Sequence, residues 1–299
     1  MKRKLVRQGM ATMTISLPSS WIKKYHLDDG DELDVEEKDN AIEISTGKEK
    51  KENDIELTIQ PNEIFAKGDL SHLYILGYDK ITVHFKDEET LKNIKARLPD
   101  CIGYEIIDQT ENSVTIKSIS VALEHEFDNI LNKVFLLLKE MSNEIYEAIK
   151  NQEFERLTNI REMETLNNKF TSFLLRMLCK KGYKKQNRSL QAYDLIQNLE
   201  RLGDEYKFLC DSLSKRKTAV KKEFVELLRE VNEYYNLFYH LFLKFDSEKK
   251  TKLTKMKRSL DEKTTKLLGN DKEPVLTHHL INISEKIRNA SGSFLAMSI

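Results

Sequence analysis

The sequence predicts a multidomain α+β protein, in which a small strand-rich N-terminal part precedes a larger, mainly helical part. Before about residue 120, apolar and polar residues alternate in short runs, which is the period of a half-buried strand. Beyond it, apolar residues recur at spacings of three and four, the period of a helix with one buried face. The prolines follow the same division, since Pro18, Pro61 and Pro99 lie in the first third and residues 100–273 contain none. We therefore place the main boundary near Ser118–Val121.

Length and composition exclude several classes of protein. At 299 residues the chain is long enough for two or three domains. The formal net charge is zero, so any attraction to a polyanion must be local. Apolar runs fall far short of the ~20 residues of a membrane span, and no secretory signal follows the basic N-terminus, which predicts a cytoplasmic protein without membrane insertion. The three cysteines lack the CxxC spacing of a structural zinc site.

Residues 1–47 predict a small domain made of two strands, a short helix and a hairpin. Apolar and polar side chains alternate along Met13–Leu17, and Pro18 then begins a short helix. The helix face that we expect to pack inward carries Trp21, Ile22 and Tyr25. A hairpin is predicted around residues 38–40. A domain of this size is marginally stable alone, so we expect a symmetric homodimer.

The charge distribution of this N-terminal domain is uneven. Residues 1–27 hold six cations and no acid, namely Lys2, Arg3, Lys4, Arg7, Lys23 and Lys24. Cations interspersed with hydroxyl and amide groups are suited to a phosphate backbone, and Arg3, Lys4, Arg7, Gln8, Thr12 and Thr14 form such a set. Alternatively, the basic strand pairs with the acidic hairpin, since residues 28–43 carry nine acids against one lysine. Composition alone leaves both interpretations open.

Four short motifs occur in a specific order within residues 2–45. They are Arg-Lys-Leu-Val-Arg-Gln-Gly, Thr-Ile-Ser-Leu-Pro-Ser-Ser-Trp, Leu-Asp-Asp-Gly-Asp-Glu-Leu and Ala-Ile-Glu-Ile. This order resembles the archaeal branch of the AbrB/SpoVT swapped-hairpin family. The resemblance implies that two chains interlace into a barrel-like dimer that binds double-stranded DNA. Arg3, Lys4, Arg7 and Thr12 then fall at DNA-facing positions, and Lys23 and Lys24 on the exposed helix face are the next candidates.

Residues 52–119 predict a compact α/β connector domain that follows a charged spacer. Its strands are expected at 55–59, 81–85, 104–107 and 114–119, and its helices at 70–77 and 88–98. We find no catalytic constellation in this part of the sequence. His72 and His84 are isolated histidines, which are more often ordinary residues than ligands.

The apolar pattern of the helical part predicts two three-helix bundles in tandem, over residues 121–216 and 217–299. The first helix begins at Leu123 with a long apolar stripe, and further stripes cover 153–180, 188–215, 219–246, 252–268 and 275–297. The third helix of each set carries a related pattern, Leu-Glu-Arg-Leu-Gly-Asp at 199–204 and Ile-Ser-Glu-Lys-Ile-Arg-Asn at 283–289. This likeness indicates an internal duplication.

Two carboxylates of the first pattern predict a candidate metal site. Glu200 and Asp204 are four residues apart and stack on one helix face, and Glu164 can approach them from the preceding helix. Such hard oxygen ligands suit magnesium, manganese, calcium or iron. The alternative is a solvated helix face crossed by glutamate–arginine pairs, and both interpretations remain open here.

The segment Leu-Glu-Arg-Leu-Gly-Asp-Glu at 199–205 resembles the Glu-Arg-Ile-Gly-Asp motif of the PhoU family. That resemblance implies a divalent metal or iron in bundle one, held by Glu200 and Asp204 with Glu164, whereas Asn167 replaces the next acid of the usual pattern. In bundle two Glu285 matches the motif. Arg288 and Asn289, however, replace its glycine and aspartate. The neighbouring His278 and His279 point about 100° apart on a helix, so we assign them no joint metal ion.

Together these features predict a cytoplasmic, homodimeric, DNA-binding transcriptional regulator of phosphate uptake or metabolism. Its helical part is expected to act as a PhoU-like sensor or docking domain, with a phosphate-transporter subunit as a partner. The alternative is a PhoU-like regulator that does not bind DNA, docks on a phosphate transporter or signalling kinase, and uses the N-terminal domain only to dimerise. We expect no enzyme, because the sequence lacks a Gly-rich phosphate loop, GxSxG and HExxH.

Overall fold

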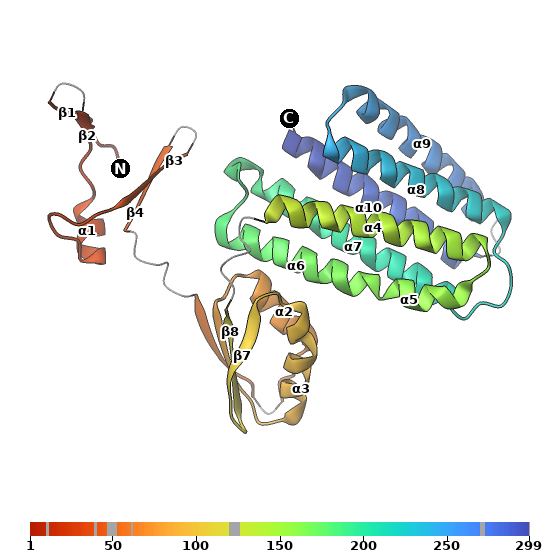
Figure 1. The fold of residues 1–299 in the computed structure, drawn as a ribbon, viewed down its shortest axis with the longest axis horizontal. Helices are drawn as coiled ribbons and strands as arrows, with labels where there is room; N and C mark the ends of the chain where they lie inside the picture. The colour runs from red at the N-terminus through yellow and green to blue at the C-terminus, as the bar shows by residue number, and fades with distance from the viewer. Residues whose placement is uncertain are drawn as a thin grey trace. The chain divides into compact units, whose positions relative to one another are not determined.

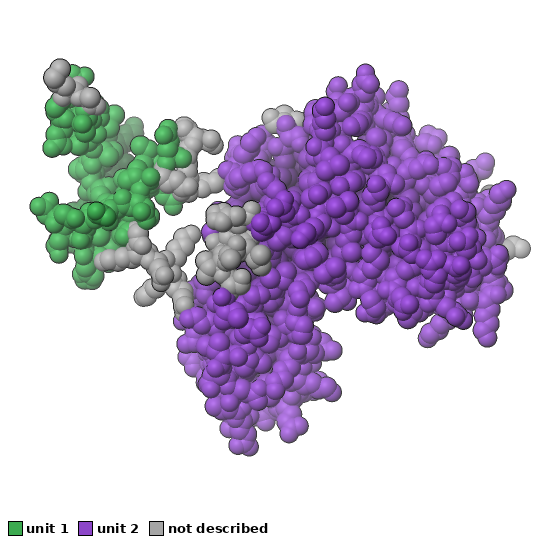
Figure 2. Space-filling model, viewed as in Figure 1, with its two compact units in different colours: residues 1–52 green, residues 53–299 purple. Residues whose placement is uncertain are grey.

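A computed structural model describes residues 1–9, 12–38, 41–46, 53–60, 62–119, 126–269 and 273–298. The chain divides into two compact units, Met1–Glu52 and Asn53–Ile299, which Figure 2 colours separately. Small sheets form the first unit, and helices dominate the second. The predicted α+β class is confirmed at this level. No described helix has both the length and the apolar character needed to cross a bilayer.

The first unit contains two separate two-stranded antiparallel sheets and one short helix (Figure 1). Its elements are β1 (Val6–Gln8), β2 (Thr12–Thr14), α1 (Ser19–Tyr25), β3 (Asp34–Lys38) and β4 (Ala41–Ser45). As expected, α1 follows Pro18, whose φ of −63° suits the start of a helix. The described strands form no closed barrel within one chain.

Two expectations for this unit differ from the structure. Strand β2 ends at Thr14 instead of Leu17, because β1 is only three residues long and its ladder finishes at the pair Val6 and Thr14. Helix α1 buries no residue, and its Tyr25 is 38% exposed. Among the described residues of the first unit, Leu27 alone is buried. One copy of this unit therefore has almost no core.

The second unit begins with a four-stranded sheet in the order β5-β6-β8-β7. β5 and β6 are parallel, and the other pairs are antiparallel. Helices α2 and α3 cover one face of this sheet (Figure 1), and the alternating Ile81, Val83, Val114 and Ile116 are fully buried. The elements are β5 (Asp54–Thr58), α2 (Lys67–Ile75), β6 (Lys80–His84), α3 (Glu88–Arg97), β7 (Tyr104–Gln109) and β8 (Ser113–Ser118).

Long helices form the rest of the second unit. Their bounds are α4 (Phe127–Lys150), α5 (Leu157–Arg161), α6 (Met163–Lys181), α7 (Ser189–Leu213), α8 (Lys222–Leu243), α9 (Ser247–Gly269) and α10 (Pro274–Ser298). The predicted helix over 153–180 is divided into a 3-10 turn (Phe154–Arg156), α5 and α6. Gly182, with φ +74°, ends α6. Leu123, the expected start of the first stripe, lies outside the described residues.

Buried apolar side chains of the α/β layer and of the six long helices belong to one continuous core. Helices α7 and α10 form the most extensive helix pair, and α4 also packs along α8. Across the α4–α8 contact, the Phe135 ring stacks on Phe242, and the Tyr235 hydroxyl donates to the Phe135 carbonyl at 2.9 Å. The first three long helices are thus joined to the last three along two lines of contact.

A buried arginine fastens the α/β layer to the helices. Arg176 of α6 is 5% exposed and lies between the rings of Tyr74 and Tyr104, 5.0 and 4.9 Å from their centroids. Its guanidinium donates to the Tyr74 carbonyl at 2.8 Å and to Asp79 Oδ1 at 3.1 Å. Lys180 also donates to Asp79. Since burying an arginine requires such complete pairing, this contact fixes the layer on α6.

Candidate functional site

All eight candidate DNA-contacting residues lie in the described part of the first unit. Arg3 and Lys4 precede β1 and are exposed, as is the neighbouring Lys2, which is not among the eight. Arg7 and Gln8 belong to β1, and Thr12 and Thr14 to β2. Lys23 and Lys24 lie on the exposed side of the last turn of α1, as expected, where cations also complement the negative end of the helix dipole.

The β1–β2 ladder determines which of these side chains share a face. Gln8 is opposite Thr12, and Val6 is opposite Thr14, whose hydroxyl donates to the Val6 carbonyl at 3.1 Å. Since alternate residues of a strand share a face, Gln8, Thr12 and Thr14 lie on one side of the ladder. Arg7 lies on the other side, opposite Met13. The structure therefore brings the hydroxyl and amide groups together and places Arg7 on the opposite face.

The six cations of residues 2–24 have no acidic partner within the part of the chain that is described. Among the described residues, no ion pair or hydrogen bond joins the side chains of Lys2, Arg3, Lys4 or Arg7 to the acidic hairpin, and Lys24 lies 5.3 Å from the centroid of the Tyr25 ring. β1 pairs with β2, whereas the acidic β3 pairs with β4. The alternative interpretation, in which the basic strand pairs with the acidic hairpin, therefore does not describe this single chain.

Large apolar side chains are also uncovered in the first unit. Val35 and Ile42 of the β3–β4 hairpin are 65% and 67% exposed. The N-terminal strands expose further apolar side chains, which are Leu5, Val6, Met13 and Ile15. A monomeric protein rarely leaves so many large apolar groups in so small a unit facing water.

The three predicted metal ligands of the first bundle do come together, but a lysine lies among them. Lys207 Nζ is 2.8 Å from Glu164 Oε1 and 2.5 Å from Asp204 Oδ1. Asn168 donates to the same Glu164 oxygen. A hard cation requires carboxylate oxygens at about 2.0–2.6 Å, and the Glu164 oxygen is already shared by two donors. As these side chains lie, they do not fit a metal ion, and the predicted metal stays a prediction.

Glu200 is the third carboxylate of this cluster and has no hydrogen bond of its own to Lys207. Burial raises the pKa of Glu200 to about 7, and the charges of Asp204 and Glu164 act in the same direction. Arg201 and Lys207 partly oppose this rise. The charges of Lys207 and Arg201 therefore do not offset the effect of burial on the pKa of Glu200.

The second bundle has a comparable cluster around Glu285. Lys257 is 7% exposed, and its Nζ is 2.9 Å from Glu285 Oε1 and also bonds Asp261. Arg288 donates to the other Glu285 oxygen from Nε at 2.9 Å. Burial alone would raise the pKa of Glu285, but the hydrogen bonds from Lys257 and Arg288 outweigh it, so this pKa is lowered. Among the described residues no three histidine, cysteine or acidic side chains form a metal-binding group.

Sequence reasoning missed Lys207 and Lys257. Lys207 follows Asp204 by one helical turn, and Lys257 precedes Asp261 by one turn, so each pair with the acid on its own helix could have been foreseen. The acids on the neighbouring helices could not. Asn167, which replaces an acid of the usual motif, is turned to the α7 backbone, where it donates to the Leu199 carbonyl at 3.3 Å.

His278 and His279 belong to a hydrogen-bond network between α7 and α10. His279 is 3.1 Å from the Ser212 hydroxyl through Nε2 and 3.3 Å from Glu205 Oε2 through Nδ1. His278 instead contacts Asn282. The order serine, histidine, glutamate occurs in nucleophilic triads, but Ser212 lies in the last turn of α7, where backbone N–H groups donate within the helix. We therefore assign the network to helix packing.

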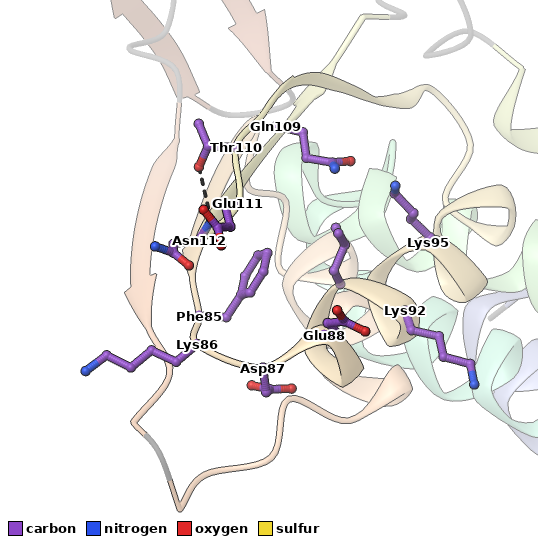
Figure 3. Close-up of a pocket in the computed structure, with 11 residues that line it drawn as sticks. Phe85, Lys86, Asp87, Glu88, Lys92, Lys95, Gln109, Thr110, Glu111 and Asn112 are labelled. Carbon is purple, nitrogen blue, oxygen red and sulfur yellow. Dashed lines mark hydrogen bonds between the residues drawn. The ribbon is translucent and has the colours of Figure 1, made fainter.

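A pocket of about 630 Å³ lies at one end of the α/β layer, between the β7–β8 turn and the start of α3 (Figure 3). The Phe85 ring points into it, and Asp87 at its edge caps α3 by accepting from the Thr90 N–H at 2.7 Å. Its lining carries three lysines and three acids, which are Lys86, Lys92, Lys95, Asp87, Glu88 and Glu111. This balance of charge selects no ligand class.

No protein-family model, curated protein or solved structure matches this chain significantly. The assignment of function therefore depends on the residues and contacts described above.

Proposed function

We propose that this chain is a homodimeric, DNA-binding transcriptional regulator of phosphate uptake or metabolism. The observation that carries the proposal is the set of six exposed cations in the first unit, which have no acidic partner in the described residues. Exposed cations suit the DNA backbone, where lysine and arginine replace condensed counterions, and the hydroxyl and amide groups of the same strands can donate hydrogen bonds. The likeness of residues 2–45 to AbrB/SpoVT domains supports the same conclusion.

Dimerisation follows from the uncovered apolar side chains of the first unit. A second copy interlaced with the first would cover Val35 and Ile42 and form the swapped-hairpin barrel that the sequence resemblance implies. Two copies would bring twelve cations into one small domain, while the whole chain stays electrically neutral. The positive potential would then be local, as binding to a polyanion requires.

The helical body would act as a PhoU-like sensor or docking domain, built from tandem three-helix bundles. The motif at 199–205 supports this part of the proposal and the link to phosphate, with a phosphate-transporter subunit as the partner. Regulation would follow from linkage. A ligand of the helical body changes DNA affinity only by the difference between its affinities for two states of the dimer.

A titration of fluorescent duplex DNA of mixed sequence tests the proposal by anisotropy. Substituting Arg3, Lys4 and Arg7 by Ala should weaken binding by roughly 100-fold, because the counterion-releasing groups are lost. The matched control substitutes three exposed cations of α9 by Ala, namely Lys252, Lys255 and Arg258, and should bind like the wild type. No binding by the wild type would favour the alternative regulator that docks on a transporter or kinase without touching DNA. Equal binding by both variants would contradict the role given to Arg3, Lys4 and Arg7.

A further inference from the structure

We infer that each half of the helical body carries a lysine ammonium group between two carboxylates, in the position that a bridging metal ion would otherwise take. Lys207 fills this role beside Glu164 and Asp204, and Lys257 fills it beside Glu285 and Asp261. The helical body is therefore stable without a metal. This inference does not depend on whether the first unit binds DNA.

The first cluster shows why the lysine and a metal ion exclude each other. The Lys207 side chain is 17% exposed and the Glu164 side chain 8%, so water solvates neither group well. The ammonium group lies between one carboxylate from α6 and one from α7, which is the position that a bridging cation would take. A metal ion at these oxygens would need Lys207 to withdraw, because two cations cannot share the same buried oxygens without strong repulsion.

The second cluster repeats the arrangement with a lysine from a different helix. Lys257 is on α9, and it joins Asp261 of its own helix to Glu285 of α10. Lysine is almost never buried unless it is paired, and Lys257 is 7% exposed. Lys207 of α7 and Lys257 of α9 thus each lie between a carboxylate of their own helix and a carboxylate of a neighbouring helix.

A repeated threonine indicates how the two clusters correspond. Thr171 of α6 and Thr264 of α9 are both buried, and each hydroxyl donates at 2.9 Å to the carbonyl four residues earlier. Glu164 and Lys257 each stand seven residues before this threonine. An anion in the first half therefore corresponds to a cation in the second, and each is completed by the opposite charge from a neighbouring helix. Charge balance is kept, although the sign at the position is inverted.

Manganese binding by the full-length protein tests this inference. Calorimetric titration of the wild type with MnCl2 should show no stoichiometric binding, and neither MnCl2 nor EDTA should move its melting temperature. Stoichiometric binding by the wild type that is lost in Glu164→Gln would overturn the inference, because a metal would then use the oxygens that we assign to Lys207.

A lysine substitution supplies the complementary result. Lys207→Met should melt at a lower temperature in EDTA, because buried carboxylates lose their counter-ion, and MnCl2 should restore the lost stability. Lys255→Met, which removes an exposed lysine of α9, should melt like the wild type under both conditions. If Lys207→Met does not fold, Lys207→Gln, which also removes the charge but keeps a polar side chain, makes the same comparison. A folded variant whose melting temperature does not respond to MnCl2 would overturn the inference.

Discussion

At the scale of single residues, the carboxylate clusters show how close the chain is to a balance of charge. In the second cluster, Lys257 and Arg288 face Glu285 and Asp261, so cations and anions are equal in number. In the first, Lys207 and Arg201 act on three acids, so the anions exceed the cations by one. Burial alone would lower the pKa of Lys207, but its hydrogen bonds to Asp204 and Glu164 outweigh burial, so this pKa is raised. The remaining excess of negative charge is accommodated by Glu200, whose raised pKa lets it keep a proton.

Glu200 gives a prediction about pH. Its pKa is about 7 in the folded protein against an ordinary value of 4.5 for glutamate, so between these values the folded state holds a proton that the unfolded chain has lost. The free energy of unfolding should therefore fall as the pH rises from about 5 to above 7. Glu200→Gln should remove this fall, which amounts to at most about 3 kcal/mol. Urea unfolding near pH 5.5 and pH 8 measures it.

The control for this prediction is Glu262→Gln, which changes an exposed acid of α9 and should keep the pH dependence of the wild type. A difference in stability between Glu200→Gln and the wild type that is the same at both pH values would show that Glu200 is already ionised at low pH. The cause assigned to its raised pKa would then be wrong.

At the scale of elements, close contact between α6 and α7 depends on a glycine. A Cβ atom added at Gly203 would lie 2.4 Å from Asn167 Nδ2 and 3.1 Å from its Cγ, and the Asn167 amide is itself held by the Leu199 carbonyl. Glycine weakens a helix interior, so its presence here is explained by packing and not by helix propensity. The motif glycine thus sets the spacing of the two helices that bring Glu164 to Asp204.

Two glycine substitutions test this explanation. Gly203→Ala should lower the free energy of unfolding by about 1–3 kcal/mol, because the methyl group forces α6 and α7 apart. Gly292→Ala in α10 is the matched control, since a Cβ there meets nothing within 4 Å, and it should raise stability by up to about 1 kcal/mol. Urea denaturation measures both. Gly203→Ala with a stability equal to or above that of the wild type would contradict the packing account.

Helices and strands of the second unit could largely be predicted from the sequence, whereas the side-chain clusters could not. The stripe over α4 is typical of a buried face, and Val134, Met141 and Ile145 are indeed fully buried. Such periodicity shows which face of a single helix is buried, but not which side chains of neighbouring helices meet. It does not show that Lys207 reaches Glu164 on α6, or that Arg176 lies between two tyrosines of the α/β layer. In the first unit the apolar pattern is clear, but the described residues of one chain leave it uncovered.

At the scale of the whole molecule, the proposed regulator requires two copies of the chain. Val35→Asp places a charge on the uncovered hairpin and should turn a dimer of 35.0 kDa chains into a monomer, measured by light scattering after size exclusion. Leu190→Asp is the control, because Leu190 is 82% exposed on α7 and lies outside the proposed dimer surface. A dimeric mass for Val35→Asp, or a monomeric mass for the wild type, would contradict the proposed dimer.

DNA binding and neutrality of the whole chain are compatible only if the positive charge is concentrated. Nine acids lie in residues 28–43, directly after the basic segment, so the first unit is positive on some surfaces and negative on others. Among the described residues, no contact joins these acids to the exposed cations of β1 and α1. The proposed DNA binding requires this separation of the two charged segments.

The salt dependence of duplex DNA affinity tests this central claim most directly. If about half of the twelve cations of a dimer contact phosphates, the logarithm of the association constant should fall against the logarithm of salt concentration with a slope of about −5. The variant without Arg3, Lys4 and Arg7 should give a much shallower slope. A wild-type slope near zero would mean that these cations displace no counterions from DNA, and it would contradict the proposed function.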